Sequence, residues 1–266
     1  MRIILFTNAR DEKHIKEWVA HHLNLGFDFI HIFDHKSIIP INKLFKPNPK
    51  LRINRNNTDG QVKGMFMDSS IEIAKKEKYD WMMYLDADEF LFLRDHETIH
   101  DFIKSYGDVN QIGFNWLMFG SNFLENEPDG MMLDNYIRCN SNINRHIKSI
   151  AKLSDITSFN SAHCYHVNSI QKSVYAYQNK RFNKTDFFWN DIPNKSYTDL
   201  PAYICHYINQ AFSVYKQRRL SRQRDDGSIR KFTHTPDTLN MMDNDVINIE
   251  VRDKYSEKNA ELIKTL

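Results

Sequence analysis

The 266-residue sequence has few cysteines and no long apolar run. Its three cysteines, Cys139, Cys164 and Cys205, form no Cys-x-x-Cys pair, so we expect reduced thiols and neither a zinc finger nor a disulfide framework. The apolar run after Met1 is too short for a signal peptide, and no stretch of about 18 apolar residues predicts a transmembrane helix. We therefore expect a soluble, cytoplasmic protein.

Glycine is scarce too, and neither sign of charge is in clear excess. Lysine and arginine number 36 against 34 aspartate and glutamate residues, a formal net charge of +2, which does not call for a nucleic-acid partner. Only eight glycines are present, and none of them forms a glycine-rich phosphate loop near Thr7. This lack disfavours a nucleotidyltransferase, which we keep as an alternative.

The first hundred residues alternate between strand and helix patterns. Short apolar runs predict strands at residues 3–7, 29–33, 51–54 and 81–85. Helical periodicity predicts helices at residues 15–23, 61–78 and 99–106. Asp11 is placed to cap the first helix and Gly26 to end it. This rhythm predicts an α/β fold with a mostly parallel sheet flanked by helices, whose ligands bind beyond the carboxyl ends of the strands.

The rest of the chain is less regular. Residues 112–166 predict a smaller antiparallel region with long loops, and residues 182–201 predict a long loop of the kind that often binds ligands. Residues 211–224 predict a helix rich in Lys and Arg, which either holds the protein at an acidic membrane surface or presents a solvated face. We divide the chain into a domain at 1–225 and a C-terminal helical extension at 226–266.

Three carboxylates follow the predicted strand at 81–85. Burying Asp86, Asp88 and Glu89 together would be costly, because like charges repel and lose their hydration. A divalent cation such as Mn²⁺ or Mg²⁺ removes that cost, since it prefers oxygen ligands. In the Asp-x-Asp spacing, Asp86 and Asp88 can turn to the same side while Ala87 points away. The alternative is a solvated acidic turn that caps the next helix.

Further blocks of residues accompany this turn along the chain. They are Arg10-Asp11-Glu12 with Glu17-Trp18, His21-His22 and Gly26; His31-Ile32-Phe33-Asp34 with Ser37 and Gln61; Asp80-Trp81 with Leu85-Asp86-Ala87-Asp88-Glu89-Phe90; Trp116 with Phe119-Gly120-Ser121; Lys148-Ser149-Ile150; His163; and His206-Tyr207. In order and spacing they resemble glycosyltransferase family 92 and the related family-2-like glycosyltransferase domains, over residues 1–225. Asp11 departs from the pattern, because the family usually has Asn there.

This resemblance implies a GT-A (Rossmann-like) fold with the antiparallel region on the acceptor side. It further implies a metal-dependent glycosyltransferase that moves a sugar from a nucleoside-diphosphate sugar, expected to be a UDP-sugar, to a glycan or other hydroxyl acceptor with inversion. The metal, Mn²⁺ or Mg²⁺, would be held by Asp86, Asp88 and His206. The alternatives are a core histidine for His206 and, for the whole chain, a catalytically inactive nucleotide-sugar or glycan-binding module of the same fold.

The other site candidates follow from the same resemblance. Those for the donor are Thr7, Arg10, Glu12, Asp34, Gln61, Asp86 and Lys148. Those for the transferred sugar or the acceptor are Trp116, Gly120, Ser121 and His163. Asp186 and Asp191 are the candidates for the catalytic base of an inverting enzyme, whereas a retaining enzyme would need no such base. The alternatives are helix capping and surface charge for the donor set, and core packing for Trp116.

Overall fold

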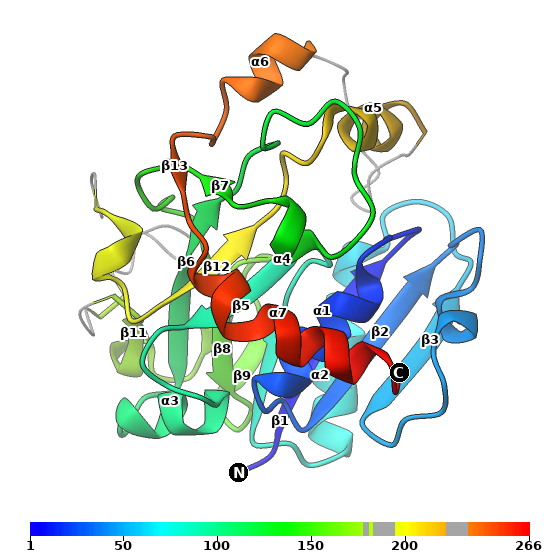
Figure 1. Ribbon diagram of the computed structural model, residues 1–266. Helices are drawn as coiled ribbons and strands as arrows, with labels where there is room; N and C mark the ends of the chain where they lie inside the picture. The colour runs from blue at the N-terminus through cyan, green and yellow to red at the C-terminus, as the bar shows by residue number, and fades with distance from the viewer. Residues whose placement is uncertain (178–180, 183–194, 222–233) are drawn as a thin grey trace.

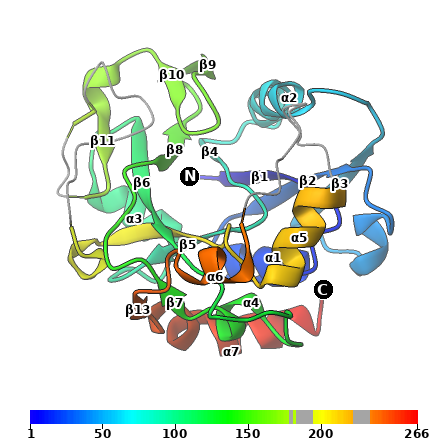
Figure 2. The same cartoon turned by 90° about the horizontal axis from the view of Figure 1, so that it is seen from above.

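A mixed sheet forms the centre of the molecule (Figure 1). The computed structural model describes residues 1–177, 181–182, 195–221 and 234–266. Within these residues, nine strands form one sheet in the order β3-β2-β1-β4-β8-β6-β12-β5, and β11 pairs with β6 beside this path. The view from above shows α2 on one side of the sheet and α1, α4 and α7 on the other (Figure 2).

The first four strands of the chain are parallel neighbours. β1 pairs with β2 on one side and with β4 on the other, and β2 pairs with β3. Their bounds are β1 Ile3–Ala9, β2 Phe29–His35, β3 Leu51–Asn56 and β4 Trp81–Tyr84. The four predicted strands are confirmed, and β1, β2 and β3 extend further at their carboxyl ends than the apolar runs indicate.

The three predicted helices are present, and a 3₁₀ helix that was not predicted lies between β2 and β3. Their bounds are α1 Ile15–Asn24, the 3₁₀ helix η1 Ile41–Leu44, α2 Lys63–Lys76 and α3 Ile99–Ser105. Gly26 follows α1 with φ of 90°, a conformation that favours glycine, so its role in ending the helix is confirmed. The predicted cap is wrong: His14 occupies the N-cap without a side-chain bond, while the Asp11 carboxylate accepts a hydrogen bond from the Ile38 N–H at 2.6 Å.

The second half of the sheet mixes both strand directions. β8 runs antiparallel between β4 and β6, β12 and β11 lie parallel to β6, and β5 closes the edge antiparallel to β12. The bounds are β5 Glu89–Leu93, β6 Gln111–Met118, β8 Ile147–Lys152, β11 Ser173–Tyr175 and β12 Ala202–His206. Two small antiparallel pairs stand apart: β9 Ile156–Phe159 with β10 Tyr165–Val167, and β7 Arg138–Cys139 with β13 Val246–Ile247. The predicted α/β class is confirmed.

Two apolar clusters cover the two faces of the sheet. Along β1, Ile3 and Leu5 belong to the larger cluster, which includes α1 and α7, whereas Ile4 and Phe6 belong to the cluster under α2. This alternation follows from the two-residue period of a strand. A strand buried on both faces reads as one continuous apolar run, which explains why β1 is easily found in the sequence.

The C-terminal part of the chain packs on the rest of the molecule. The remaining helices are α4 Met132–Asn135, η2 Ile170–Lys172, η3 Tyr197–Asp199, α5 Phe212–Ser221, α6 Pro236–Asn240 and α7 Glu250–Ile263. α7 lies against α1, where the Asn24 amide donates to the Asn259 side-chain oxygen at 3.0 Å, and Tyr255 and Leu266 are buried in the larger apolar cluster. The predicted boundary between 225 and 226 lies outside the described residues and stays a prediction.

Cys139, Cys164 and Cys205 are buried free thiols, as expected from their spacing. In the part of the chain that the structure describes, no helix is both long enough and apolar enough to cross a membrane.

Candidate functional site

The acidic turn lies at the carboxyl end of β4. The Leu85 N–H still pairs with the Phe6 carbonyl at 3.0 Å, so the chain leaves the sheet only at Asp86. The Glu89 carboxylate turns back and accepts a hydrogen bond from the Asp86 N–H at 2.8 Å. The Tyr207 N–H donates to the Asp88 carbonyl at 2.9 Å and ties the turn to the end of β12. The backbone of the turn is therefore held from both sides.

Two lysines contact the carboxylate of Asp86. Lys63, at the start of α2, contacts Oδ1, and Lys148, on β8, donates to Oδ2 at 3.0 Å. Burial alone would raise the pKa of Asp86, but the charges of Lys148 and Lys63 lower it well below its usual range. Lys148 has only 1% of its side chain exposed, whereas Lys63 is 23% exposed and reaches the turn from the solvent side.

Glu89 lies beneath the turn and is fully buried. Its Oε2 atom is 3.4 Å from Lys148 Nζ, and its Oε1 atom has no hydrogen-bond partner within the described residues. Burial raises the pKa of Glu89 to about 8, and the neighbouring charges of Asp86 and Asp88 act in the same direction. The charge of Lys148 acts in the opposite direction, and the net effect favours the protonated acid.

Asp88 faces a different cation. Arg218 on α5 donates to Asp88 Oδ2 at 3.0 Å through Nη1 and to Glu12 Oε2 at 2.6 Å through Nη2. Burial alone would lower the pKa of the guanidinium, but Glu12 and Asp88 raise it. Among the described residues, Arg218 and the two lysines thus place three positive charges against the carboxylates of Glu12, Asp86 and Asp88.

His206 ends β12 opposite Asp88. Its Nε2 atom lies 3.8 Å from Asp88 Oδ1, and its Nδ1 atom is buried without a hydrogen-bond partner in the described part of the chain. Burial lowers the pKa of His206 to about 4, so the imidazole is neutral at pH 7 and able to ligate a metal.

The predicted metal ligands fit a divalent cation in part. No three His, Cys, Asp or Glu side chains of the described residues gather into a group that could hold a metal ion. A carboxylate and a neutral imidazole are suitable ligand types, but the 3.8 Å between Asp88 Oδ1 and His206 Nε2 lies between the separations of about 3.0 and about 4.2 Å that cis and trans ligands have in an octahedral site. A bound ion would therefore require a small shift of one side chain. Mn²⁺ and Mg²⁺ usually take their other ligands from substrate phosphates and water. Asp86 contacts lysines with both oxygens, so its role as a ligand stays a prediction.

Aromatic rings pack beside His206. Trp116 on β6 has its ring centroid 4.4 Å from that of His206 and 5.2 Å from that of His163, and it stacks on His146 at 5.1 Å with an interplanar angle of 22°. Burial lowers the pKa of His163 to about 4, and the charge of Lys148 acts in the same direction. These neutral rings form a wall at the amino-terminal side of β8, next to the acidic turn.

The remaining donor candidates differ in how exposed they are and in what they contact. Thr7 is fully buried, and Gln61 is exposed before α2. Asp34 is 1% exposed and holds its own loop: its carboxylate accepts from the N–H groups of Ser37 and Ile41 at 3.1 and 3.0 Å and pairs with Arg55. Glu12 and Arg10 lie on the loop after β1, and Arg10 Nε is buried without a partner within the described residues.

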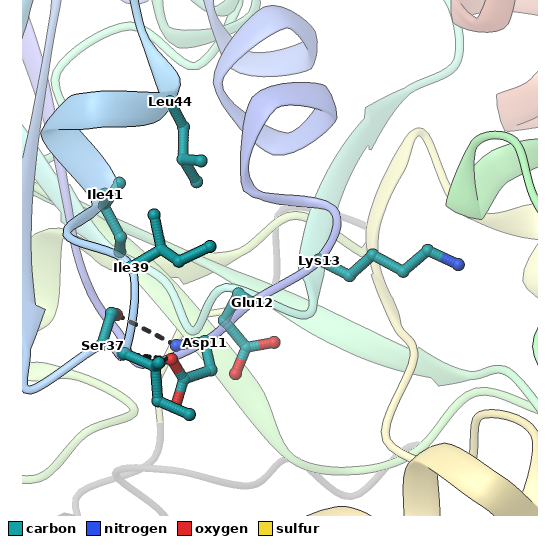
Figure 3. Close-up of a pocket in the computed structure, with 8 residues that line it drawn as sticks. Asp11, Glu12, Lys13, Ser37, Ile39, Ile41 and Leu44 are labelled. Carbon is teal, nitrogen blue, oxygen red and sulfur yellow. Dashed lines mark hydrogen bonds between the residues drawn. The ribbon is translucent and has the colours of Figure 1, made fainter.

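A pocket of about 400 Å³ opens between this loop and the one that follows β2 (Figure 3). Residues of both loops line it: Asp11, Glu12, Lys13, Ser37, Ile38, Ile39, Ile41 and Leu44. The Asp11 N–H donates to Ser37 Oγ at 3.0 Å, which joins the two loops. The volume lies within the range of small-molecule sites, about 300–1,000 Å³, and the wall is mostly aliphatic. Because Glu12 also binds Arg218, the pocket adjoins the acidic turn.

Gly120 and Ser121 contact the C-terminal part of the chain. A Cβ atom on Gly120 would lie 2.6 Å from the Asp243 carbonyl oxygen, and Ser121 Oγ donates to Asn240 Oδ1 at 2.7 Å. Both residues thus pack against the end of α6 or the segment that follows it, and their predicted contact with a sugar stays a prediction. Asp186 and Asp191, the candidate bases, lie outside the described residues.

Three residues of this site were not predicted from the sequence. Lys63 carries no motif, Arg218 is one of several basic residues on its helix, and His146 lies in an irregular segment. Arg218 is 13% exposed and paired with carboxylates, so it is not available to a membrane surface. Membrane association of the other basic residues of 211–224 stays a prediction.

More than half of the sequence matches a known family. Residues 73–246, more than half of the chain, match Glycosyltransferase family 92, so the protein belongs to that family. The resemblance to this family, inferred from the motifs, is confirmed, and the flanked, mostly parallel sheet agrees with the α/β class that the resemblance implied. A search of curated proteins finds no significant sequence match.

Solved structures with a related fold are distant. TarS from S. aureus, residues 1–349 in complex with UDP-GlcNAc, has 11% sequence identity and a TM-score of 0.40, covering 58% of this chain and 46% of that chain. The 4-diphosphocytidyl-2C-methyl-D-erythritol synthase from Anaerococcus prevotii has 12% identity and a TM-score of 0.36, covering 70% of this chain and 92% of that chain. The present chain thus spans about half of the TarS chain. At these TM-scores neither similarity carries an argument about the reaction.

Proposed function

We propose that this protein transfers a sugar from a nucleoside-diphosphate sugar to a hydroxyl of a glycan or another acceptor, at the acidic turn. The observation that carries this proposal is the pairing of Asp88 with the neutral His206 at 3.8 Å, beside the cations of Lys63 and Arg218. Membership of glycosyltransferase family 92 supports the class of reaction. We expect a UDP-sugar as the donor, with its nucleoside in the pocket between Glu12 and Ile39.

In this proposal the chain's own residues prepare the departure of the diphosphate. Asp88 and His206 would hold Mn²⁺ or Mg²⁺, which stabilises the charge that develops on the leaving group. Lys63 lies at the solvent side of the turn, where its ammonium can contact a phosphate oxygen. Lys148 is too deeply buried for that contact and instead keeps Asp86 ionised beneath the site.

The acceptor is expected on the aromatic side of the turn. Trp116 and His146 present stacked rings next to His163, and such faces pack well against the apolar face of a sugar. We further propose an inverting reaction. The acceptor oxygen attacks the anomeric carbon, the bond to the diphosphate breaks with its electron pair leaving on the phosphate oxygen, and Asp186 or Asp191 takes the proton of the hydroxyl.

A binding and turnover experiment tests the proposal. In Mn²⁺, UDP or a UDP-sugar should raise the unfolding temperature, since a ligand at a hundred times its Kd stabilises by about 2.7 kcal/mol. Asp88→Ala should lose this metal-dependent stabilisation while it still unfolds cooperatively, whereas Asp129→Ala, at an exposed position away from the turn, should keep it. An unchanged response of Asp88→Ala would refute the metal assignment.

The same assay separates the alternative functions. Hydrolysis or transfer of the donor sugar, stopped by a chelator, is the result expected for the glycosyltransferase. Donor binding without any turnover would indicate an inactive binding module. Release of pyrophosphate from a nucleoside triphosphate and a sugar phosphate would instead indicate a nucleotidyltransferase.

A further inference from the structure

Arg218 joins the two loops that border the donor site. Its guanidinium spans Glu12, on the loop after β1, and Asp88, on the acidic turn, with bonds of 2.6 and 3.0 Å. All three side chains are largely buried, with exposed fractions of 13% for Arg218, 19% for Glu12 and 15% for Asp88. A buried bridge of this kind is built into the fold, unlike the exposed ion pairs elsewhere on the surface.

The bridge occupies a carboxylate that the proposed metal site needs. Asp88 Oδ2 is bound to Arg218, while Oδ1 faces His206. A divalent cation at Asp88 and His206 would stand close to the guanidinium, and the two positive charges would repel each other. Arg218 and the metal ion therefore compete for Asp88 as long as no other anion is present.

A diphosphate removes this competition. Its anionic oxygens accept charge-assisted hydrogen bonds from a guanidinium, and they can also serve as the further ligands that the metal ion needs. We propose that Arg218 is a donor-binding residue whose Nη1 end passes from Asp88 to the diphosphate when the divalent cation binds Asp88, while Glu12 keeps the Nη2 end in place. This inference rests on the proposed function and adds one residue and one exchange of partners to it.

The exchange predicts that metal and diphosphate bind cooperatively. Mn²⁺ alone must bind Asp88 against the positive charge of Arg218, and UDP alone must draw Arg218 away from Asp88 without a replacement cation. When both bind, Asp88 exchanges Arg218 for Mn²⁺, and the Nη1 end of Arg218 exchanges Asp88 for the diphosphate. Removal of Arg218 should therefore strengthen the binding of Mn²⁺ alone and weaken the binding of UDP in the presence of Mn²⁺.

Titration calorimetry with Mn²⁺ alone, UDP alone and UDP in saturating Mn²⁺ tests this inference. For Arg218→Gln we expect about tenfold tighter binding of Mn²⁺ alone and at least tenfold weaker binding of UDP in Mn²⁺ than for the wild type, in line with the loss of a charge-assisted pair. Lys216→Gln is the matched control: it removes an exposed positive charge from the same helix and should change neither affinity.

A second variant keeps the test decisive if Arg218→Gln folds poorly. Glu12→Gln removes the negative charge of one of the two carboxylates that Arg218 contacts, so the guanidinium should bind Asp88 more strongly. Mn²⁺ alone should therefore bind this variant more weakly than the wild type. Parallel losses of both affinities in Arg218→Gln, or no change in either, would overturn the exchange while leaving the proposed function in place. If the wild type binds UDP neither alone nor in saturating Mn²⁺, the proposed function itself fails.

Discussion

The buried ion pair under the acidic turn gives the sharpest prediction about stability. Lys148→Met keeps much of the side-chain volume but removes the charge that contacts Asp86 Oδ2 at 3.0 Å and lies 3.4 Å from Glu89 Oε2. Breaking a buried pair by removal of one partner costs about 3–5 kcal/mol. We expect the lower end, about 3 kcal/mol, because Asp86 is 30% exposed and keeps Lys63 as a partner.

Glu89 limits the cost further. The charge of Lys148 lowers the pKa of Glu89, so its removal would raise that pKa further and favour the uncharged acid. Asp86→Asn should therefore restore part of the lost stability when it is added to Lys148→Met. The interaction energy of this double-mutant cycle should fall at about 1–3 kcal/mol in favour of the native pair.

Urea unfolding followed by circular dichroism at pH 7 measures these differences. The slope of the transition should stay unchanged, so that a shift in midpoint reports stability alone. Lys172→Met is the control, because Lys172 pairs with Asp108 at 2.6 Å on the exposed surface, and its variant should unfold at the wild-type midpoint. Equal midpoints for Lys148→Met and Lys172→Met would refute the reasoning.

Three further predictions concern other parts of the molecule. Burial alone would lower the pKa of His14, but Glu127 and Glu17 raise it to about 9. The protonated imidazole should therefore stabilise the folded state by on the order of 3 kcal/mol. This stabilisation is complete below pH 6.5 and is lost as the pH rises through 9. Unfolding free energies between pH 6 and 9.5 should show this loss in the wild type, and a His14→Gln variant with the same slope would contradict it. Gly120→Ala should cost about 1–3 kcal/mol in thermal unfolding, because its Cβ would meet the Asp243 carbonyl, whereas Gly64→Ala, in open space, should not; equal melting temperatures would refute the packing role. Asp191→Asn should bind UDP normally but lose transfer in a product assay, and full transfer would remove Asp191 as the base.

The fold was largely predictable where packing is local and periodic. β1 and β4 are buried on both faces, so their apolar residues stand in unbroken runs that mark strands. Gly26 ends α1 as predicted because a φ of 90° is a local requirement. Asp11 was predicted as a helix cap, and its actual bond to the Ile38 N–H joins two loops that lie far apart in the sequence.

The site was predictable to the extent that motifs carry it. Asp86, Asp88, Lys148 and His206 were named from the sequence, and the structure brings them together around one turn. Lys63 and Arg218 escaped notice because single basic residues on amphipathic helices have no signature of their own. Lys63 on α2 contacts Asp86 and Arg218 on α5 contacts Asp88 only because the tertiary structure places both helices beside the acidic turn.

By itself the sequence determined the class of fold, the family and the acidic turn at the end of a buried strand, because strand periodicity and motif spacing are properties of neighbouring residues. The tertiary structure decided how the charges of that turn are balanced. Lys63, Lys148 and Arg218 come from three separate elements and meet Asp86 and Asp88 only after the sheet has formed. The interaction of two charges depends on their distance in space, and the order of residues along the chain does not give that distance.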